Sequence, residues 1–147
     1  MKQKILGISA LLLMLVVSGS ALFAKDIPVA EKDLPQAVRS YVNTHFPEAA
    51  IALAVKDTEG VSHSYEIKLN NGVELDFNAK GEITSIDGRE KLPDSVIPAK
   101  ILAYVQAQYP QNYITDWTLE RTGQEVELNN GLELKFNRKG DFLRLDS

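Results

Sequence analysis

The sequence predicts an α+β fold made of two tandem repeats, each a helix followed by four antiparallel strands, in a two-layer α/β arrangement. The first observation is a duplication: residues 69–87 and 128–146 align without gaps and are identical at 11 of 19 positions. The second is that the spacing of apolar residues changes from about four to two after each expected helix. The third is that Asn-Asn-Gly and Lys-Gly turn signals recur at the same places in both copies.

The N-terminal residues 1–24 are typical of a signal peptide. Lys2 and Lys4 precede an apolar run at 5–17 and a tail of small residues, which is the order of a secretory signal. The apolar run is too short for a stable membrane anchor. The expected cleavage site follows Ala24, with Ala21 as the alternative.

Export would leave a domain of residues 25–147, with the two repeats at about 34–87 and 92–146. The chain contains no cysteine that could be lipidated, so we expect a periplasmic or secreted protein without a membrane anchor. The lack of cysteine also excludes thiol catalysis, disulfides and cysteine-based metal sites. The signal region holds two of the 16 basic residues and none of the 20 acidic ones, so the mature net charge is 14 − 20 = −6. This acidic balance argues against nucleic acid or anionic lipid as a partner.

The first helix is expected within residues 34–47, because one face carries apolar residues at helical spacing: Leu34, Val38, Tyr41, Val42 and Phe46. Pro35 suits the first turn, and Pro47 ends the helix. The second helix is expected within 92–110. Compared with the first copy, the second copy has five extra residues around 97–101, and Pro98 is expected to restart the helix.

Strands follow each helix. In the first copy alternating apolar residues predict strands at 51–55, 65–69 and 73–77, and a fourth begins at Ile83. Ile83 and Ile86 break the alternation, so a bulge or a change of exposure is expected between them.

The Asn-Asn-Gly turn allows two registers. A two-residue loop would place Ile67 opposite Asp76, whereas a three-residue loop places Ile67 opposite Leu75. Because register follows the buried face, the three-residue loop closed by Gly72 is favoured. The same reasoning pairs Val126 with Leu134. We expect one eight-strand sheet or two abutting four-strand sheets, with both helices on one face and the other face open.

The tandem pattern LP–helix–YVxxxxP–strand–LNNGxELxFNxKGxxxxID resembles the β-lactamase-inhibitor-like, PepSY-like family of exported bacterial envelope proteins. The resemblance covers about residues 34–146. It implies a fold like that of the secreted β-lactamase inhibitor, with a curved sheet. The resemblance assigns no inhibitory role to any residue of this sequence.

Enzyme signatures are absent from the sequence. His45 and His63 lie on different elements without a partner at zinc-binding spacing, and no nucleophile elbow or phosphate-binding loop occurs. We therefore predict no catalytic residue, no bound metal or cofactor, and no enzymatic activity.

The candidate partner-binding residues lie on the expected open face. The favoured register opposes Glu66 to Asp76 and Glu127 to Glu133. Like charges in direct opposition are mildly destabilising, which suits a basic partner or a divalent cation. Trp117 and Tyr113 complete the set if they are exposed, whereas a buried Trp117 that fills the shorter second hairpin is the alternative.

Three functions fit these observations. The first is a non-enzymatic envelope protein that binds a protein or peptide through its open sheet face. The second is an inhibitor of a peptidase or another hydrolase. The third is a module that binds a cation or a small ligand.

Overall fold

The computed structural model describes residues 26–59 and 63–146, and the expected signal peptide at 1–24 lies outside them. The elements in chain order are β1 (Asp26–Pro28), the 3-10 turn η2 (Glu31–Asp33), α1 (Gln36–His45), β2 (Ile51–Asp57), β3 (Ser64–Leu69), β4 (Glu74–Phe77), β5 (Ile83–Asp87), η3 (Asp94–Val96), α2 (Ala99–Gln108), β6 (Ile114–Leu119), β7 (Gly123–Leu128), β8 (Glu133–Asn137) and β9 (Phe142–Asp146).

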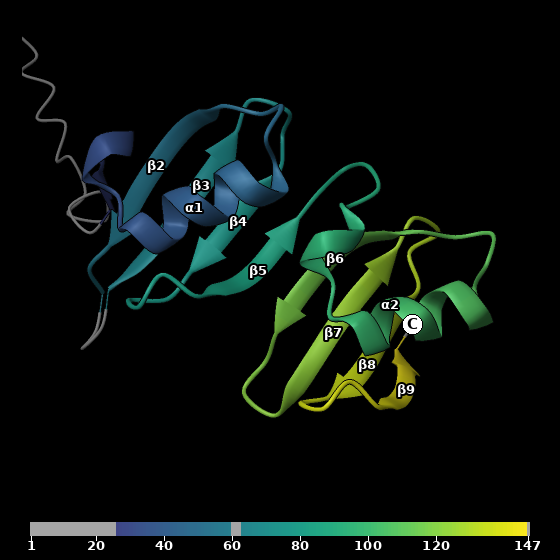
Figure 1. Ribbon diagram of the computed structural model, residues 1–147. Coiled ribbons are helices and arrows are strands. Elements are labelled where there is room, and N and C mark those ends of the chain that lie inside the picture. The colour runs from purple at the N-terminus through teal and green to yellow at the C-terminus, as the bar shows by residue number, and fades with distance from the viewer. Residues whose placement is uncertain (1–25, 60–62, 147) are drawn as a thin grey trace, which may run out of the picture.

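The nine strands of the described residues form one antiparallel sheet, in which spatial order follows sequence order from β1 to β9. Both helices lie on the same face of this sheet (Figure 1). Each helix is only ten residues long and buries two residues at helical spacing, Val38 and Val42 in α1 and Ile101 and Val105 in α2. None of the helices in the described ranges is long and apolar enough to cross a membrane.

The predicted fold of two tandem helix-plus-four-strand repeats in two layers is wrong. The strands continue through the middle of the molecule, because β5 pairs directly with β6. In addition, β1 adds a strand that the sequence did not indicate, with Ile27 opposite Lys56 of β2. A strand edge carries unpaired N–H and C=O groups, and joining the copies through β5 and β6 satisfies two such edges at once.

The expected five-residue insertion before the second helix is also wrong. The turn η2 precedes α1 as η3 precedes α2, with a constant spacing of 63 residues between equivalent elements (31 to 94 and 36 to 99). Pro35 and Pro98 are the N-cap residues of the two helices. The repeated Leu-Pro at 92–93 had suggested a longer second copy, but the counterpart of Leu34-Pro35 is Ile97-Pro98.

The register predicted for the hairpins is confirmed. Ile67 lies opposite Leu75, and the Leu69 N–H donates to the Val73 carbonyl at 2.8 Å. Gly72 closes the loop with φ of 87°, in the left-handed region that glycine enters without strain. In the fourth strand, Asp76 pairs with Ser85 and Phe77 with Ile83, so the expected bulge between Ile83 and Ile86 is also confirmed.

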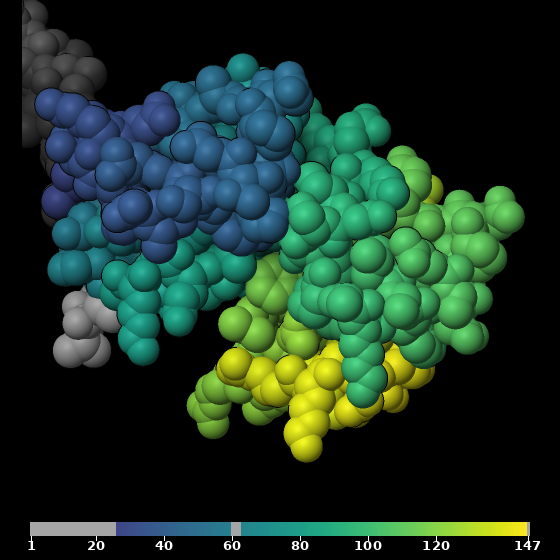
Figure 2. Space-filling model, viewed as in Figure 1, coloured from purple at the N-terminus to yellow at the C-terminus, as the bar shows by residue number. Residues whose placement is uncertain are grey.

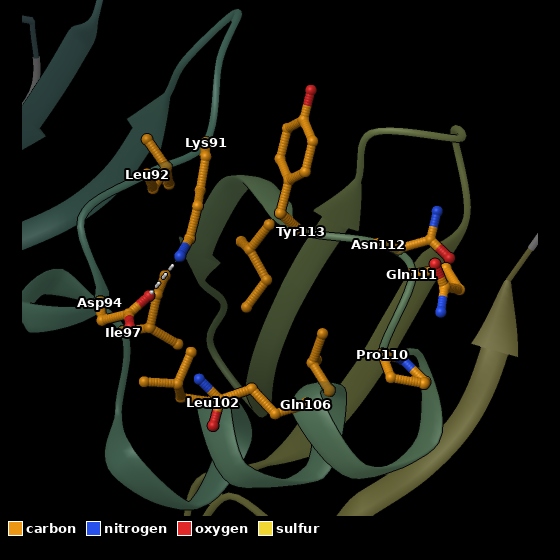
Figure 3. A pocket seen from close by; sticks show the side chains of 12 residues that line it. Lys91, Leu92, Asp94, Ile97, Leu102, Gln106, Pro110, Gln111, Asn112 and Tyr113 are labelled. Carbon is orange, nitrogen blue, oxygen red and sulfur yellow. Dashed lines mark ion pairs between the residues drawn. The ribbon is translucent and has the colours of Figure 1, made fainter.

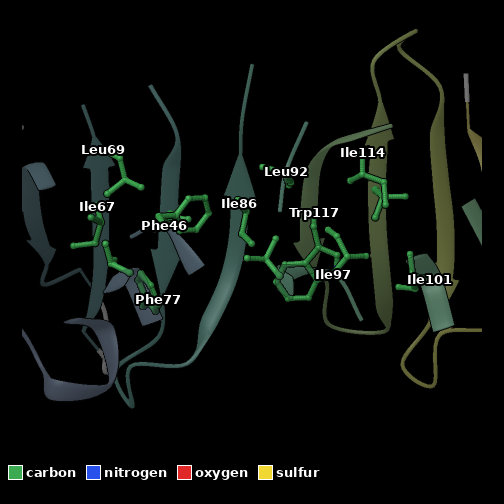
Figure 4. Packing of buried hydrophobic residues seen from close by; sticks show 14 of the residues in the cluster. Phe46, Ile67, Leu69, Phe77, Ile86, Leu92, Ile97, Ile101, Ile114 and Trp117 are labelled. Atoms are coloured by element: carbon green, nitrogen blue, oxygen red, sulfur yellow. The ribbon is translucent and has the colours of Figure 1, made fainter. Parts of the chain in front are cut away.

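One hydrophobic core extends across the sheet (Figure 4). At its centre, Trp117 of β6 lies opposite Ile86 of β5, and both side chains are buried. The register gives the counterpart of Trp117 in the first copy as Ala54, since Ala54 faces Ile67 as Trp117 faces Val126.

The segment between the copies is tied to both of them. His45 at the end of α1 is hydrogen-bonded to Ser95 of η3 at 2.9 Å. The Leu92 N–H donates to the Ile114 carbonyl at the start of β6. Figure 2 shows this segment between the two halves on the helix-bearing face.

Candidate functional site

The face of the sheet opposite the helices holds the candidate site. Side chains alternate along each strand, so the buried residues Ile67, Ile86 and Trp117 face the helices and their neighbours face the other side. No described helix covers this second face, which we call the open face (Figure 1).

The register lines up carboxylates across the open face. Each member of this set lies directly opposite the next on the adjacent strand, from β4 to β9. We call it the acidic row, and its members are Glu74, Asp87, Asp116, Glu127, Glu133 and Asp146. Directly opposed side chains on antiparallel strands have Cβ atoms about 5 Å apart, so the row concentrates negative charge along one line.

The two ends of the acidic row are neutralised. Lys68 Nζ lies 2.6 Å from Glu74 Oε1, and this contact raises the pKa of Lys68. At the other end, Arg144 Nε lies 3.0 Å from Asp146 Oδ1 and lowers the pKa of that carboxyl. In the described residues, none of the four central members has a lysine or arginine within ion-pair distance. The centre of the row therefore has negative charge that no ion pair neutralises, although Arg89 lines the hollow above it.

Asp116 carries the largest electrostatic cost of the row. Burial, followed by the charges of Asp87 and Glu127, raises the pKa of Asp116 to about 6, although the Thr115 hydroxyl donates a hydrogen bond to it at 2.5 Å. The raised pKa means that burial and the neighbouring carboxylates destabilise the charged form of Asp116. A cation placed at this position would remove the penalty.

A shallow hollow of about 420 Å³ opens above Asp87, Asp116 and Glu127. Arg89, Tyr113 and Asn129 are among the other residues of its wall. The Asn129 side chain accepts a hydrogen bond from the Tyr113 N–H at 3.0 Å, which holds the start of β6 against the end of β7. The hollow is polar and fits a hydrated or charged group better than an apolar one.

Differences between the two copies complete the acidic row, whose members Glu74 and Asp87 recur in the second copy as Glu133 and Asp146. Asp116 faces Glu127 in the second copy, whereas the equivalent pair in the first copy is Leu53 and Lys68. The duplication therefore accounts for four carboxylates of the row, and the differences between the copies add Asp116 and Glu127 at its centre.

A second polar line runs beside the acidic row. In it Glu66 faces Asp76, and Asp76 faces Ser85. Partial burial, together with the charges of Glu66, Glu74 and Asp87, raises the pKa of Asp76. In the second copy the position of Asp76 is taken by Lys135, which pairs with Glu125 and with Glu120.

The structure brings four of the six sequence-predicted site residues to the open face: Glu66, Asp76, Glu127 and Glu133. Trp117 is 5% exposed on the helix side, where its Nε1 donates to Gln124 Oε1 at 3.0 Å. The buried alternative for Trp117 is thus the one that occurs. Tyr113 is half-buried at the rim of the polar hollow.

Sequence reasoning missed Asp87 and Asp116. Asp87 closes the duplicated block, as Asp146 does in the second copy, and this repetition was a usable signal. The face on which Asp87 lies depends on the position of the bulge in β5, which the sequence alone did not locate. Asp116 became visible only when β5 and β6 were known to pair.

A second hollow, of about 400 Å³, lies on the helix side between α2 and the start of β6 (Figure 3). Its walls include Leu92, Ile97 and Leu102, and a Lys91–Asp94 ion pair of 3.2 Å stands at one side. Across the described ranges, no group of three or more histidine, aspartate or glutamate side chains has the geometry of a metal site.

The family model described as "Putative beta-lactamase-inhibitor-like, PepSY-like" matches the chain twice, at residues 21–85 and 63–144. The chain belongs to this family, as the sequence resemblance indicated. No curated protein matches the sequence.

Solved structures share the fold. A protein from Bacteroides vulgatus is 31% identical with a TM-score of 0.79, and the match covers 83% of this chain and 97% of that one. A protein from Bacteroides thetaiotaomicron is 30% identical with a TM-score of 0.79 and the same coverage. Another from B. vulgatus is 34% identical with a TM-score of 0.77, covering 83% of this chain and 99% of that one. All three are described as putative periplasmic proteins, and the B. thetaiotaomicron protein also as calcium-regulated. These relatives support the periplasm as the compartment of this chain.

Proposed function

We propose that this protein is a non-enzymatic periplasmic protein that binds a positively charged segment of another protein on its open sheet face. The observation that carries the proposal is the acidic row, whose four central carboxylates have no cationic partner among the described residues. Aligned like charges destabilise the sheet. A bound cationic segment would relieve this repulsion, and the relief would favour binding. Export through a cleaved signal at residues 1–24 is part of the proposal.

The row also favours a particular kind of partner. It crosses six strands, and the hollow above its centre is shallow, so an extended segment with several lysine or arginine residues would match it better than a single charged group. Contacts of this kind depend strongly on salt, because the partly exposed carboxylates are screened by ions.

Calorimetry with a short peptide of alternating lysine and threonine tests the proposal. We expect binding at about 50 mM NaCl that weakens strongly at about 300 mM NaCl. The triple variant Asp87→Asn, Asp116→Asn, Glu127→Gln should bind about tenfold more weakly or not at all. A matched control, Glu31→Gln, Asp33→Asn, Glu48→Gln, removes the same charge from exposed positions in η2 and between α1 and β2, and should bind like the wild type.

Equal losses in the triple variant and the control would show that only net charge matters, and would contradict a site on the open face. Absence of peptide binding at low salt would also count against the proposal.

Calcium is a second candidate ligand of the same face. It is favoured by the 30% identical relative described as calcium-regulated and by the raised pKa of Asp116 next to Asp87. Carboxylate oxygens are the ligands that Ca²⁺ prefers. Because no three carboxylates of the described residues have the geometry of a metal site, Asp87 and Asp116 would supply the protein ligands and water would complete the shell. Calcium should raise the melting temperature more than magnesium does, and Asp116→Asn should remove the difference. If calcium produces neither binding heat nor a melting shift, this candidate is eliminated.

A further inference from the structure

The two edges of the sheet differ in how they are protected. At the β1 edge, Pro28 offers no N–H donor and Asp26 carries a charge, and both features discourage further strand pairing. The β9 edge contains no proline, and Leu143 and Leu145 are 56% and 45% exposed. Within the described residues, no strand pairs with the outer side of β9.

The duplication shows what such an edge looks like when it is paired. β5 is the counterpart of β9, and Ile86 is the counterpart of Leu145. Ile86 is completely buried because β6 lies against β5 and places Trp117 opposite Ile86. Leu145 has the same position in its hairpin but no neighbouring strand.

The backbone of Leu145 faces the free edge. The Leu128 N–H donates to the Leu132 carbonyl at 2.9 Å, and antiparallel bonding alternates from residue to residue, so Leu134 bonds towards β7. Leu145, which lies opposite Leu134, must then direct its N–H and C=O away from β8. The first copy behaves in the same way. The Gly88 N–H donates to the Thr115 carbonyl of β6, so Ile86, two residues earlier in β5, also directs its backbone groups towards β6.

The side chains on either side of Leu145 have opposite charges, so two copies of β9 paired antiparallel about Leu145 would be complementary in charge. Arg144 and Asp146 flank Leu145 on the open face and already form an ion pair within one chain, with Nε and Oδ1 3.0 Å apart. A two-fold axis at Leu145 would oppose Arg144 to Asp146 of the partner subunit, and would oppose the two Leu145 side chains. An axis at Arg144 or at Asp146 would instead oppose like charges.

We propose that β9 is a dimer interface, in which two copies of this chain pair edge to edge about a two-fold axis at Leu145. The two sheets join into one, with all helices on one face and both acidic rows on the other. The contact is one short strand from each copy, so the dimer is weak, with a Kd on the order of 0.1 mM. The inference does not depend on the proposed binding of a cationic segment.

Sedimentation equilibrium of the purified protein from about 10 µM to about 1 mM tests the proposal. We expect a reversible monomer–dimer equilibrium. Leu145→Pro should leave a monomer over this whole range, because proline removes the exposed N–H at an edge position where it can be accommodated. Leu53→Lys is the matched control: Leu53 is 48% exposed on β2, and its replacement should leave the dimer unchanged.

A charge exchange tests the register without a backbone change. Arg144→Asp should weaken the dimer at least tenfold, since it opposes two acidic residues. The double variant Arg144→Asp, Asp146→Arg should restore it, because the exchanged pair is again complementary. A wild type that is monomeric at about 1 mM, or a dimer that survives both Leu145→Pro and Arg144→Asp, would overturn the proposal.

Discussion

The two copies of the duplicated block are identical at 11 of 19 positions but have different surroundings. Ile86 and Leu145 occupy equivalent positions, yet Ile86 is completely buried and Leu145 is 45% exposed. The difference arises because β5 lies inside the sheet and β9 lies at its edge. Burial is therefore set by the place of a strand in the sheet as well as by the local sequence.

β2 and β6, which precede the two blocks, show the opposite case. They have equivalent positions in the two copies, but their sequences differ. Ala54 and Trp117 both face the helices and both are buried. The larger side chain belongs to β6, where the two halves meet and where Gln124 accepts its N–H. The open face differs as well, since Asp116 replaces Leu53 and Glu127 replaces Lys68.

The largest expected effect is at this junction. Trp117→Ala should lower the free energy of unfolding by about 3–5 kcal/mol, because it leaves a cavity and removes the hydrogen bond to Gln124. Urea denaturation measures the loss. The matched truncation Ala54→Gly should cost only about 1 kcal/mol. A loss below about 1 kcal/mol for Trp117→Ala would mean that the junction does not depend on this side chain.

The equivalent aliphatic residues provide the second comparison. Ile86→Ala should cost about 2–4 kcal/mol, whereas Leu145→Ala should cost less than about 1 kcal/mol, since only Ile86 is covered by a neighbouring strand. Both can be measured by urea denaturation at low protein concentration. Equal losses would contradict the contrast between an internal and an edge strand.

The acidic row predicts a pH effect of intermediate size. The pKa of Asp116 is about 6 in the folded protein, above its ordinary value, so the folded state binds the proton more tightly than the unfolded chain does. Stability should therefore fall as pH rises from about 4 to about 6. Asp116→Asn should be more stable than the wild type by about 1 kcal/mol at pH 7–8 and equal to it near pH 4, allowing for solvent screening of this partly exposed group. Thermal melts across this range measure the difference, and a gain that does not change with pH would exclude titration of Asp116 as its cause.

The smallest effect concerns the exchange between Asp76 and Lys135. In the first copy Asp76 faces Glu66, whereas in the second copy Lys135 pairs with Glu125. Asp76→Lys should copy the second arrangement and raise the free energy of unfolding by about 0.5 kcal/mol at neutral pH. Asp76→Asn removes the repulsion without adding an attraction and should give a smaller gain. Destabilisation by Asp76→Lys would show that the like-charge pair is compensated elsewhere.

Local sequence was sufficient for the register of both hairpins. Gly72 and Gly131 supply the positive φ that the turns require, and only one register buries Ile67, Leu75, Val126 and Leu134 together. This information already opposed Glu66 to Asp76 and Glu127 to Glu133. Asp87 and Asp116 were not found, because their positions depend on a bulge and on the pairing of β5 with β6.

By itself, the sequence determined the family, the hairpin turns and the face on which each paired residue lies, since all of these follow from local backbone preferences and the alternation of side chains. Only the tertiary structure decided that the nine strands between residues 26 and 146 that it describes join in one sheet, that Trp117 is buried at the junction, and that six carboxylates form one row. These features depend on which strand edges meet, and hydrogen bonding between strands distant in sequence is not encoded in any single segment.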